Sequence, residues 1–259
     1  MFSAYDGPVA ATRTNDRSTA RPRQLYCSVC RRCALLDVAA VCPHPPLLVP
    51  SLGVGPAPEL DRLRKDCRDA VAAVADARPD VTYVVGVDSA PRARSWLPWG
   101  VDEAVDVPEP MPLALLVGAW LTTGSVRSFV VVDDDMDPAD CAALGRELAA
   151  SAARVGLVVM GDGSARRSEK APGYLDDRAA GYDDAVAKAF ASADVATLLQ
   201  LDPGIARDLM VAGRASWQVL AGAAADRPAP HVRAAAGAAP YGVGYHVVTW
   251  SWQDDALLR

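Results

Sequence analysis

From residue 35 onward, runs of β-branched and aromatic residues alternate with runs in which apolar residues recur at helical spacing. The first kind, bounded by Gly, Pro or Asp, predicts buried strands. These segments are Leu36–Cys42, Val81–Val87, Phe129–Val132, Gly156–Met160 and Tyr245–Trp252. The second kind predicts helices over Glu59–Ala77, Pro138–Arg154, Tyr182–Ala193, Pro203–Ala212 and Ser216–Ala225. Because apolar strands alternate with helices, we expect a three-layer α/β/α fold with a central mixed, largely parallel sheet.

Residues 1–34 carry no such pattern. They are polar and rich in Arg, Ser and Thr, so they cannot bury enough apolar surface to offset the entropy of ordering. We therefore expect a disordered leader, and a start codon assigned too far upstream would give the same pattern. No linker or repeat divides residues 35–259, which predicts a single domain there.

The net charge of −6 is unevenly distributed. Residues 1–34 hold six arginines and two acidic residues, whereas the rest of the chain holds 20 basic and 30 acidic residues. An acidic body argues against nucleic-acid binding, which needs a basic face. The longest strongly apolar stretch, Pro112–Leu121, is too short to cross a membrane, and we find no signal-peptide core. We therefore expect a cytoplasmic protein with neither nucleic acid nor membrane as a partner.

A histidine between prolines follows the first predicted strand, in Cys42-Pro43-His44-Pro45-Pro46. The prolines fix the backbone, so the imidazole is presented with little entropy left to lose. This arrangement suits a metal ligand or a catalytic base. A structural histidine that anchors the turn is the alternative.

Two later strands end in loops that resemble each other, each with Asp, Ser and a pair of arginines. Backbone N–H groups and guanidinium groups in such loops suit a carboxylate or a phosphate. Alternatively, each Asp caps the next segment and the arginines form surface ion pairs. A nucleophilic role for the loop serine is weak, because neither loop contains a histidine. The predicted ligand pocket comprises His44, Asp88, Ser89, Arg92, Asp162, Gly163, Ser164, Arg166 and Arg167.

The remaining candidate groups favour structural roles. The run Cys27, Cys30 and Cys33 lies in the leader and lacks the spacing of an iron–sulfur or zinc site. The acidic cluster Asp133–Asp135 is typical of a helix N-terminus. The side chain of His246 shares a strand face with Val248 and Trp250, which predicts a core residue. We also expect two buried helical cysteines, Cys67 and Cys141, and an exposed His231.

Motifs along most of residues 36–252 resemble the class III extradiol ring-cleavage dioxygenases of the B type, and most of all an alanine-rich actinobacterial branch. The motifs, in order, are Ala40–Leu48, Gly161–Ser164, Tyr182–Val186, Leu199–Pro203, Ala212–Arg214 and Tyr241–Tyr245. The resemblance implies a mixed sheet between helices and a non-haem Fe(II) held by two His and one Glu. A further His would act as acid and base while O₂ opens a catechol-type ring. It also implies a homodimer or association with a second, different chain.

The sequence departs from this family at three of the four expected positions. The first iron ligand is matched by His44, but the loop Asp88-Ser89-Ala90 lacks the second histidine, and Ala165 stands at the acid/base position. No Glu occurs after Glu169, so the third ligand is missing as well.

Two hypotheses about function remain. The first is a degenerate dioxygenase with His44 on Fe(II) and Asp88, Asp162 or His246 in other ligand roles. The second is a non-catalytic interaction module that binds a small anion in the loop Gly161–Arg167. Either would bind a small molecule, aromatic or anionic.

Overall fold

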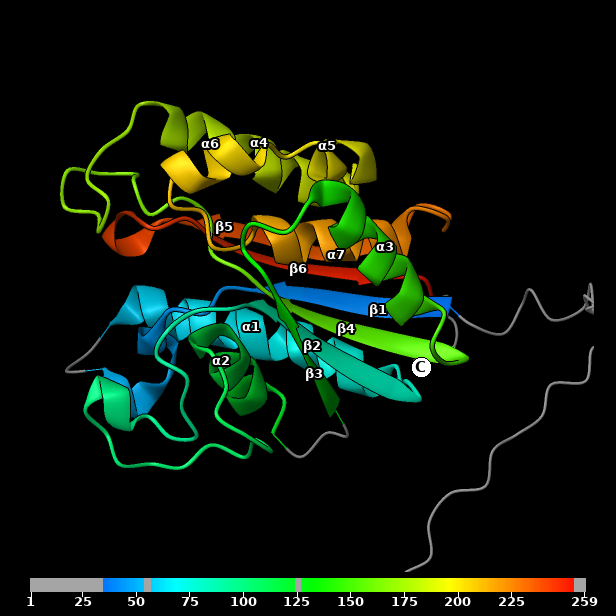
Figure 1. Cartoon of the computed structure of the whole chain (residues 1–259), viewed down its shortest axis with the longest axis horizontal. Helices are drawn as coiled ribbons and strands as arrows, with labels where there is room; N and C mark the ends of the chain where they lie inside the picture. The colour runs from blue at the N-terminus through cyan, green and yellow to red at the C-terminus, as the bar shows by residue number, and fades with distance from the viewer. Residues whose placement is uncertain (1–34, 54–56, 124–126, 254–259) are drawn as a thin grey trace, which may run out of the picture. The chain divides into compact units, whose positions relative to one another are not determined.

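The computed structural model describes residues 35–53, 57–123 and 127–253, and its centre is a six-stranded sheet (Figure 1). The predictions for residues 1–34, including the three-cysteine run, lie outside the described residues. The strand order is β3-β2-β4-β1-β6-β5, with β1 to β4 parallel and β6 antiparallel to both β1 and β5. The strands are β1 Leu35–Cys42, β2 Val81–Val87, β3 Arg127–Val132, β4 Arg154–Met160, β5 His231–Ala238 and β6 Tyr245–Ser251. The predicted α/β class and mixed, largely parallel sheet are confirmed.

Helices cover both faces of this sheet (Figure 1). On one face lie α1 and α2, and on the other lie α3, α4 and α7, with α5 and α6 beside them. The helices are α1 Pro58–Asp76, α2 Leu113–Leu121, α3 Pro138–Ala149, α4 Arg178–Ser192, α5 Val195–Leu199, α6 Pro203–Asp208 and α7 Arg214–Ala224. Among the described residues, no helix combines the length and the apolar character that a membrane span requires.

The central strands are buried on both sides, so the molecule has two apolar cores. On β1, Val38 and Ala40 pack with α1 and α2, while Ala39 and Val41 pack with α4 and α7. This alternation is the two-residue period of a strand, and it explains why β1 reads as a continuous apolar run.

The sequence pattern does not predict three of these elements. Strand β5 is rich in Ala and Gly, which have low strand propensity, and it forms by pairing with β6 from Val232 opposite Trp250 to Ala238 opposite Tyr245. Helix α2 is buried over most of its length, so it shows no polar face that would give a helical period. Helix α5 is only five residues long.

The sheet topology brings three segments together at one end of the strands. In the register, Cys42 at the end of β1 lies opposite Met160 at the end of β4. Antiparallel strand β6 begins at this same end, where Tyr245 forms an isolated bridge with Asp162. The loops after β1 and β4 therefore meet the start of β6, in the place where open α/β sheets bind ligands.

Candidate functional site

The first histidine of the site is held by the carboxylate that follows β4. The backbone N–H of His44 donates to Asp162 Oδ1 at 2.7 Å, and His44 Nδ1 lies 3.5 Å from the same oxygen. The residue is 6 % exposed, and its Nδ1 makes no hydrogen bond with any part of the chain that the structure describes. Burial raises the pKa of Asp162, and the neighbouring His44 opposes this increase. Two of the three loops predicted to hold pocket residues, those after β1 and β4, thus meet at His44 and Asp162.

A buried arginine from α1 fixes the loop that carries His44. Arg64 Nε donates to the carbonyl of Leu48 at 2.8 Å, and its Nη2 donates to the carbonyl of Leu47 at 2.7 Å. The guanidinium also pairs with Asp61 at 2.7 Å. These bonds satisfy carbonyls of the turn after His44 and limit the positions that the imidazole can take.

A second carboxylate, Asp183 on α4, organises the loop after β4. Its side chain is 1 % exposed and accepts the backbone N–H of Ser164 at 2.9 Å and the Arg167 guanidinium at 3.2 Å. Two glycines make room for it. A Cβ on Gly163 would lie 2.5 Å from Asp183 Oδ1, and one on Gly244 would lie 2.7 Å from Asp183 Cγ. The loop therefore already binds an anion, and that anion is a side chain of the same protein.

A second histidine, His246 on β6, lies next to Asp183 and is only 3 % exposed. Its Nε2 is 3.9 Å from Asp183 Oδ1, too far for a hydrogen bond, and neither ring nitrogen has a partner among the described residues. The rings of Trp217 and Phe190 pack on it, with centroids 5.6 and 6.0 Å away. The prediction that His246 is a core residue is confirmed, but its hydrogen bonds are not satisfied within the described chain.

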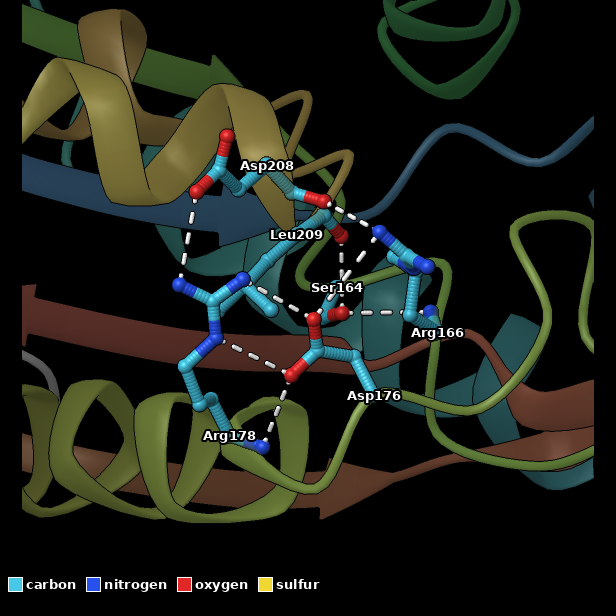
Figure 2. Close-up of polar contacts among 6 residues, drawn as sticks. All are labelled: Ser164, Arg166, Asp176, Arg178, Asp208 and Leu209. Carbon is cyan, nitrogen blue, oxygen red and sulfur yellow. Dashed lines mark hydrogen bonds and ion pairs between the residues drawn. The ribbon is translucent and has the colours of Figure 1, made fainter.

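Arg166, the first arginine of the loop after β4, binds groups of the protein itself (Figure 2). Arg166 Nη1 donates to the carbonyl of Asp208 at 2.8 Å and lies 3.9 Å from Asp176, which in turn binds Arg178 at 2.9 Å. Beside it, the fully buried Ser164 hydroxyl donates to the carbonyl of Leu209 at 2.8 Å. Because this hydroxyl is buried and donates to a backbone carbonyl, it is not exposed to a substrate as a nucleophile would be.

The loop after β2 forms an exposed ion pair, as in the alternative interpretation of that sequence. Arg92 Nη2 lies 2.7 Å from Asp88 Oδ2, and both residues are exposed. The half-buried Ser89 lies between them in sequence. Within the described part of the chain, no hydrogen bond or ion pair links these three residues to His44 or Asp162.

The sequence predicts that the amides of Gly163 and Ser164 face a ligand, but the structure leaves neither free. The Gly163 N–H donates to the carbonyl of Gly244 at 2.7 Å, and the Ser164 N–H donates to Asp183. Arg167 is bound to the same carboxylate. An external anion would have to displace Asp183, so these contacts weaken the interpretation of the loop as an anion site.

The donors present do not fit the iron site that the family resemblance implies. In the described ranges, no three His, Cys, Asp or Glu side chains gather as metal ligands would. His44 Nδ1 lies 3.5 Å from Asp162 and His246 Nε2 lies 3.9 Å from Asp183, and no third ligand side chain of the described ranges joins either pair. An Fe(II) centre of the facial-triad type needs two histidines and a carboxylate around one point.

The structural residues of the site are less visible in the sequence. The sequence places Asp183 only within the motif Tyr182–Val186, although its spacing from Ala179 and Val186 puts it on the buried stripe of α4. A carboxylate on such a stripe is rarely buried without a partner, and this signal could have identified Asp183.

The other predictions of structural roles are confirmed. Cys67 and Cys141 are buried, His231 is exposed, and Asp137 caps α3 next to the acidic cluster.

No family model matches the chain, and no curated protein is significantly similar to it.

Proposed function

We propose that this chain is an extradiol-dioxygenase-type protein that has lost iron-dependent ring cleavage and binds a small molecule at the carboxyl ends of β1 and β4. One observation carries the proposal. Three imidazole nitrogens at this sheet end, Nδ1 of His44 and both nitrogens of His246, are buried with no hydrogen-bond partner in the described ranges. Buried polar groups are rarely left unpaired in folded proteins, so unpaired imidazole nitrogens at the carboxyl end of the sheet favour a site that a ligand completes.

The loss of ring cleavage is supported by the lack, among the described residues, of three ligand side chains gathered around one point. Each imidazole lies next to a different Asp, at 3.5 Å for His44 and 3.9 Å for His246. The residue at the expected acid/base position is Ala165, which cannot transfer a proton. Loss of a general acid/base group typically lowers a rate by about 10²–10⁴ even where the other groups are present.

The binding role is supported by where the unpaired nitrogens lie. They are at the carboxyl end of a largely parallel sheet, and Arg64, Asp162 and Asp183 fix the loops around them. Groups held in this way lose little entropy when a ligand binds. A homodimer and a cytoplasmic location stay predictions from the sequence.

The loss of ring cleavage is tested with the full chain by anaerobic loading with Fe(II), desalting and elemental analysis. Oxygen uptake is then followed with catechol and with 3,4-dihydroxybenzoate. We expect iron far below one per chain and oxygen uptake equal to that of His44→Ala. One iron per chain that is lost in His44→Ala, together with catechol-dependent oxygen uptake, would refute the proposal.

The binding role is tested by saturation-transfer NMR with a set of small polar compounds. We expect compounds that bind the wild-type chain and no longer bind the double variant His44→Phe, His246→Phe. The variant Arg92→Ala, which changes an exposed ion pair outside the site, should keep the same compounds. Compounds that bind the double variant as well as they bind the wild type would place binding elsewhere.

A further inference from the structure

A cavity of about 270 Å³ lies between α4 and the end of β5, beside His246. Its lining includes Arg167, Asp183, Asp184, Ala187, Gly237 and His246. The volume is just below the usual range for pockets that hold drug-sized molecules, roughly 300–1,000 Å³. The cavity therefore suits a compound of few heavy atoms.

His246 is the group in this cavity that most needs a partner. A neutral imidazole offers one N–H donor and one nitrogen acceptor, and here the described residues pair with neither, although the side chain is almost fully buried. Above it, Gly237 leaves open space, because a Cβ built there would come no closer than 4.0 Å to His246 Nδ1. The imidazole thus borders the cavity, while both of its nitrogens are buried.

The spacing between His246 and Asp183 defines what can bind. Nε2 and Oδ1 are 3.9 Å apart, so a single nitrogen or oxygen atom beside the pair, about 2.8 Å from each, could hydrogen-bond to both. That atom has to donate to the carboxylate, which only accepts. A primary ammonium group has three N–H donors, enough for Asp183 Oδ1 and for the lone pair of His246.

The charge of the lining favours a cation over a neutral hydroxyl compound. Two carboxylates, Asp183 and Asp184, face one guanidinium, Arg167. Arg167 lies 3.2 Å from Asp183 and 3.9 Å from Asp184, so it is shared between them. One negative charge is left over, and the Asp184 side chain that carries it is 77 % exposed at the edge of the cavity.

We propose that this cavity binds a small primary ammonium compound, with the ammonium between His246 and Asp183 and its charge balanced by Asp184. The inference rests on the proposed function, because it names the ligand class for the same sheet end. Ala187 and Gly237 would contact the carbon atoms of such a ligand.

The experiment uses the full chain labelled with ¹⁵N-histidine, titrated with ethylammonium chloride while the imidazole resonances are recorded. The His246 resonance is assigned from its loss in His246→Phe. We expect a saturable shift of this resonance with a Kd of roughly millimolar, as suits a ligand of very few heavy atoms. Sodium chloride and ethanol at the same concentrations serve as salt and neutral controls, and ethanol should bind at least about five-fold more weakly.

Two variants and a matched control locate the binding. Gly237→Val fills the cavity and should abolish the shift. Asp184→Asn removes an exposed charge and should weaken binding about three-fold, whereas Asp140→Asn, an exposed carboxylate on α3, should leave the Kd unchanged. No saturable shift in the wild type, equal binding of ethanol, or an unchanged Kd in Asp184→Asn would overturn the inference. Catechol-dependent oxygen uptake would instead overturn the proposed function, whatever the ammonium titration shows.

Discussion

The buried carboxylate of Asp183 is the best single test of how the site is held together. Asp183→Ala removes the acceptor of the Ser164 amide and the partner of Arg167. Asp184, the next residue of α4, provides a matched control, because its side chain is exposed and lies 3.9 Å from the same guanidinium. Both changes delete one carboxylate from the same helix turn, and only the first one unpairs a buried group.

The size of the effect follows from these contacts. A buried amide left without an acceptor costs about 1–3 kcal/mol. Arg167 keeps 25 % of its side chain exposed, so water can replace part of the lost contact, and we assign it about 1 kcal/mol. The expected loss for Asp183→Ala is therefore about 3 kcal/mol in the free energy of unfolding. Asp184→Ala should lose less than about 0.5 kcal/mol, as exposed substitutions usually do.

Urea denaturation of the wild type and both variants, followed by far-UV circular dichroism, measures this difference directly. The midpoint should fall for Asp183→Ala with little change in the slope m. In a thermal scan, about 3 kcal/mol corresponds to a Tm lower by roughly 6–12 °C for a chain of this size. A difference of less than about 1 kcal/mol between the two variants would show that Asp183 does not hold the loop.

Two further predictions test other parts of the fold. Gly222→Ala on α7 should lower the free energy of unfolding by about 1–3 kcal/mol in urea denaturation, because the added Cβ would overlap the backbone of Ala142 on α3. Gly181→Ala, at an open position of α4, should instead raise it by about 0.5–1 kcal/mol. Equal effects of the two substitutions would contradict the close packing of α3 on α7. Arg178 lowers the pKa of Asp176 to about 2, so this carboxylate stabilises the fold above its unfolded pKa near 3.8 and loses that contribution as the pH falls to about 2. The Tm difference between wild type and Asp176→Asn should therefore shrink across that range, and a constant difference would refute the ion pair (Figure 2).

The strands that the sequence predicts are those whose side chains are large and apolar. The pattern predicts Val81–Val87 with the bounds that β2 has, because Val, Tyr and Thr fit a buried pleated surface. It does not predict strand β5, because Ala and Gly residues carry no local strand preference and β5 exists through pairing with β6. Tertiary pairing of this kind depends on a partner strand, so a local pattern does not contain it.

For the candidate site, the sequence predicts where residues lie better than it predicts which groups they bind. The order of the strands brings His44 and Asp162 together, as the rule for ligands at carboxyl ends of strands implies. The same rule does not separate Arg92, which pairs locally with Asp88, from Arg167, which reaches a buried carboxylate 16 residues away. Which carboxylate an arginine meets depends on side-chain packing, and the spacing of residues in a loop does not determine it.

The buried carboxylate of Asp183 explains why this end of the sheet has both a fixed loop and a histidine without a hydrogen-bond partner among the described residues. Asp183 uses one oxygen for the Ser164 amide and the other for Arg167, so it holds the loop after β4 and remains 3.9 Å from His246. At a shorter distance Nε2 would pair with Asp183 itself, whereas at 3.9 Å a donor atom beside the two can still reach both. The residues that stabilise the loop are thus the same ones that set the distance a ligand has to bridge. A change in loop stability at Asp183 should therefore alter ligand affinity as well, whereas a change at Asp184 should alter affinity alone.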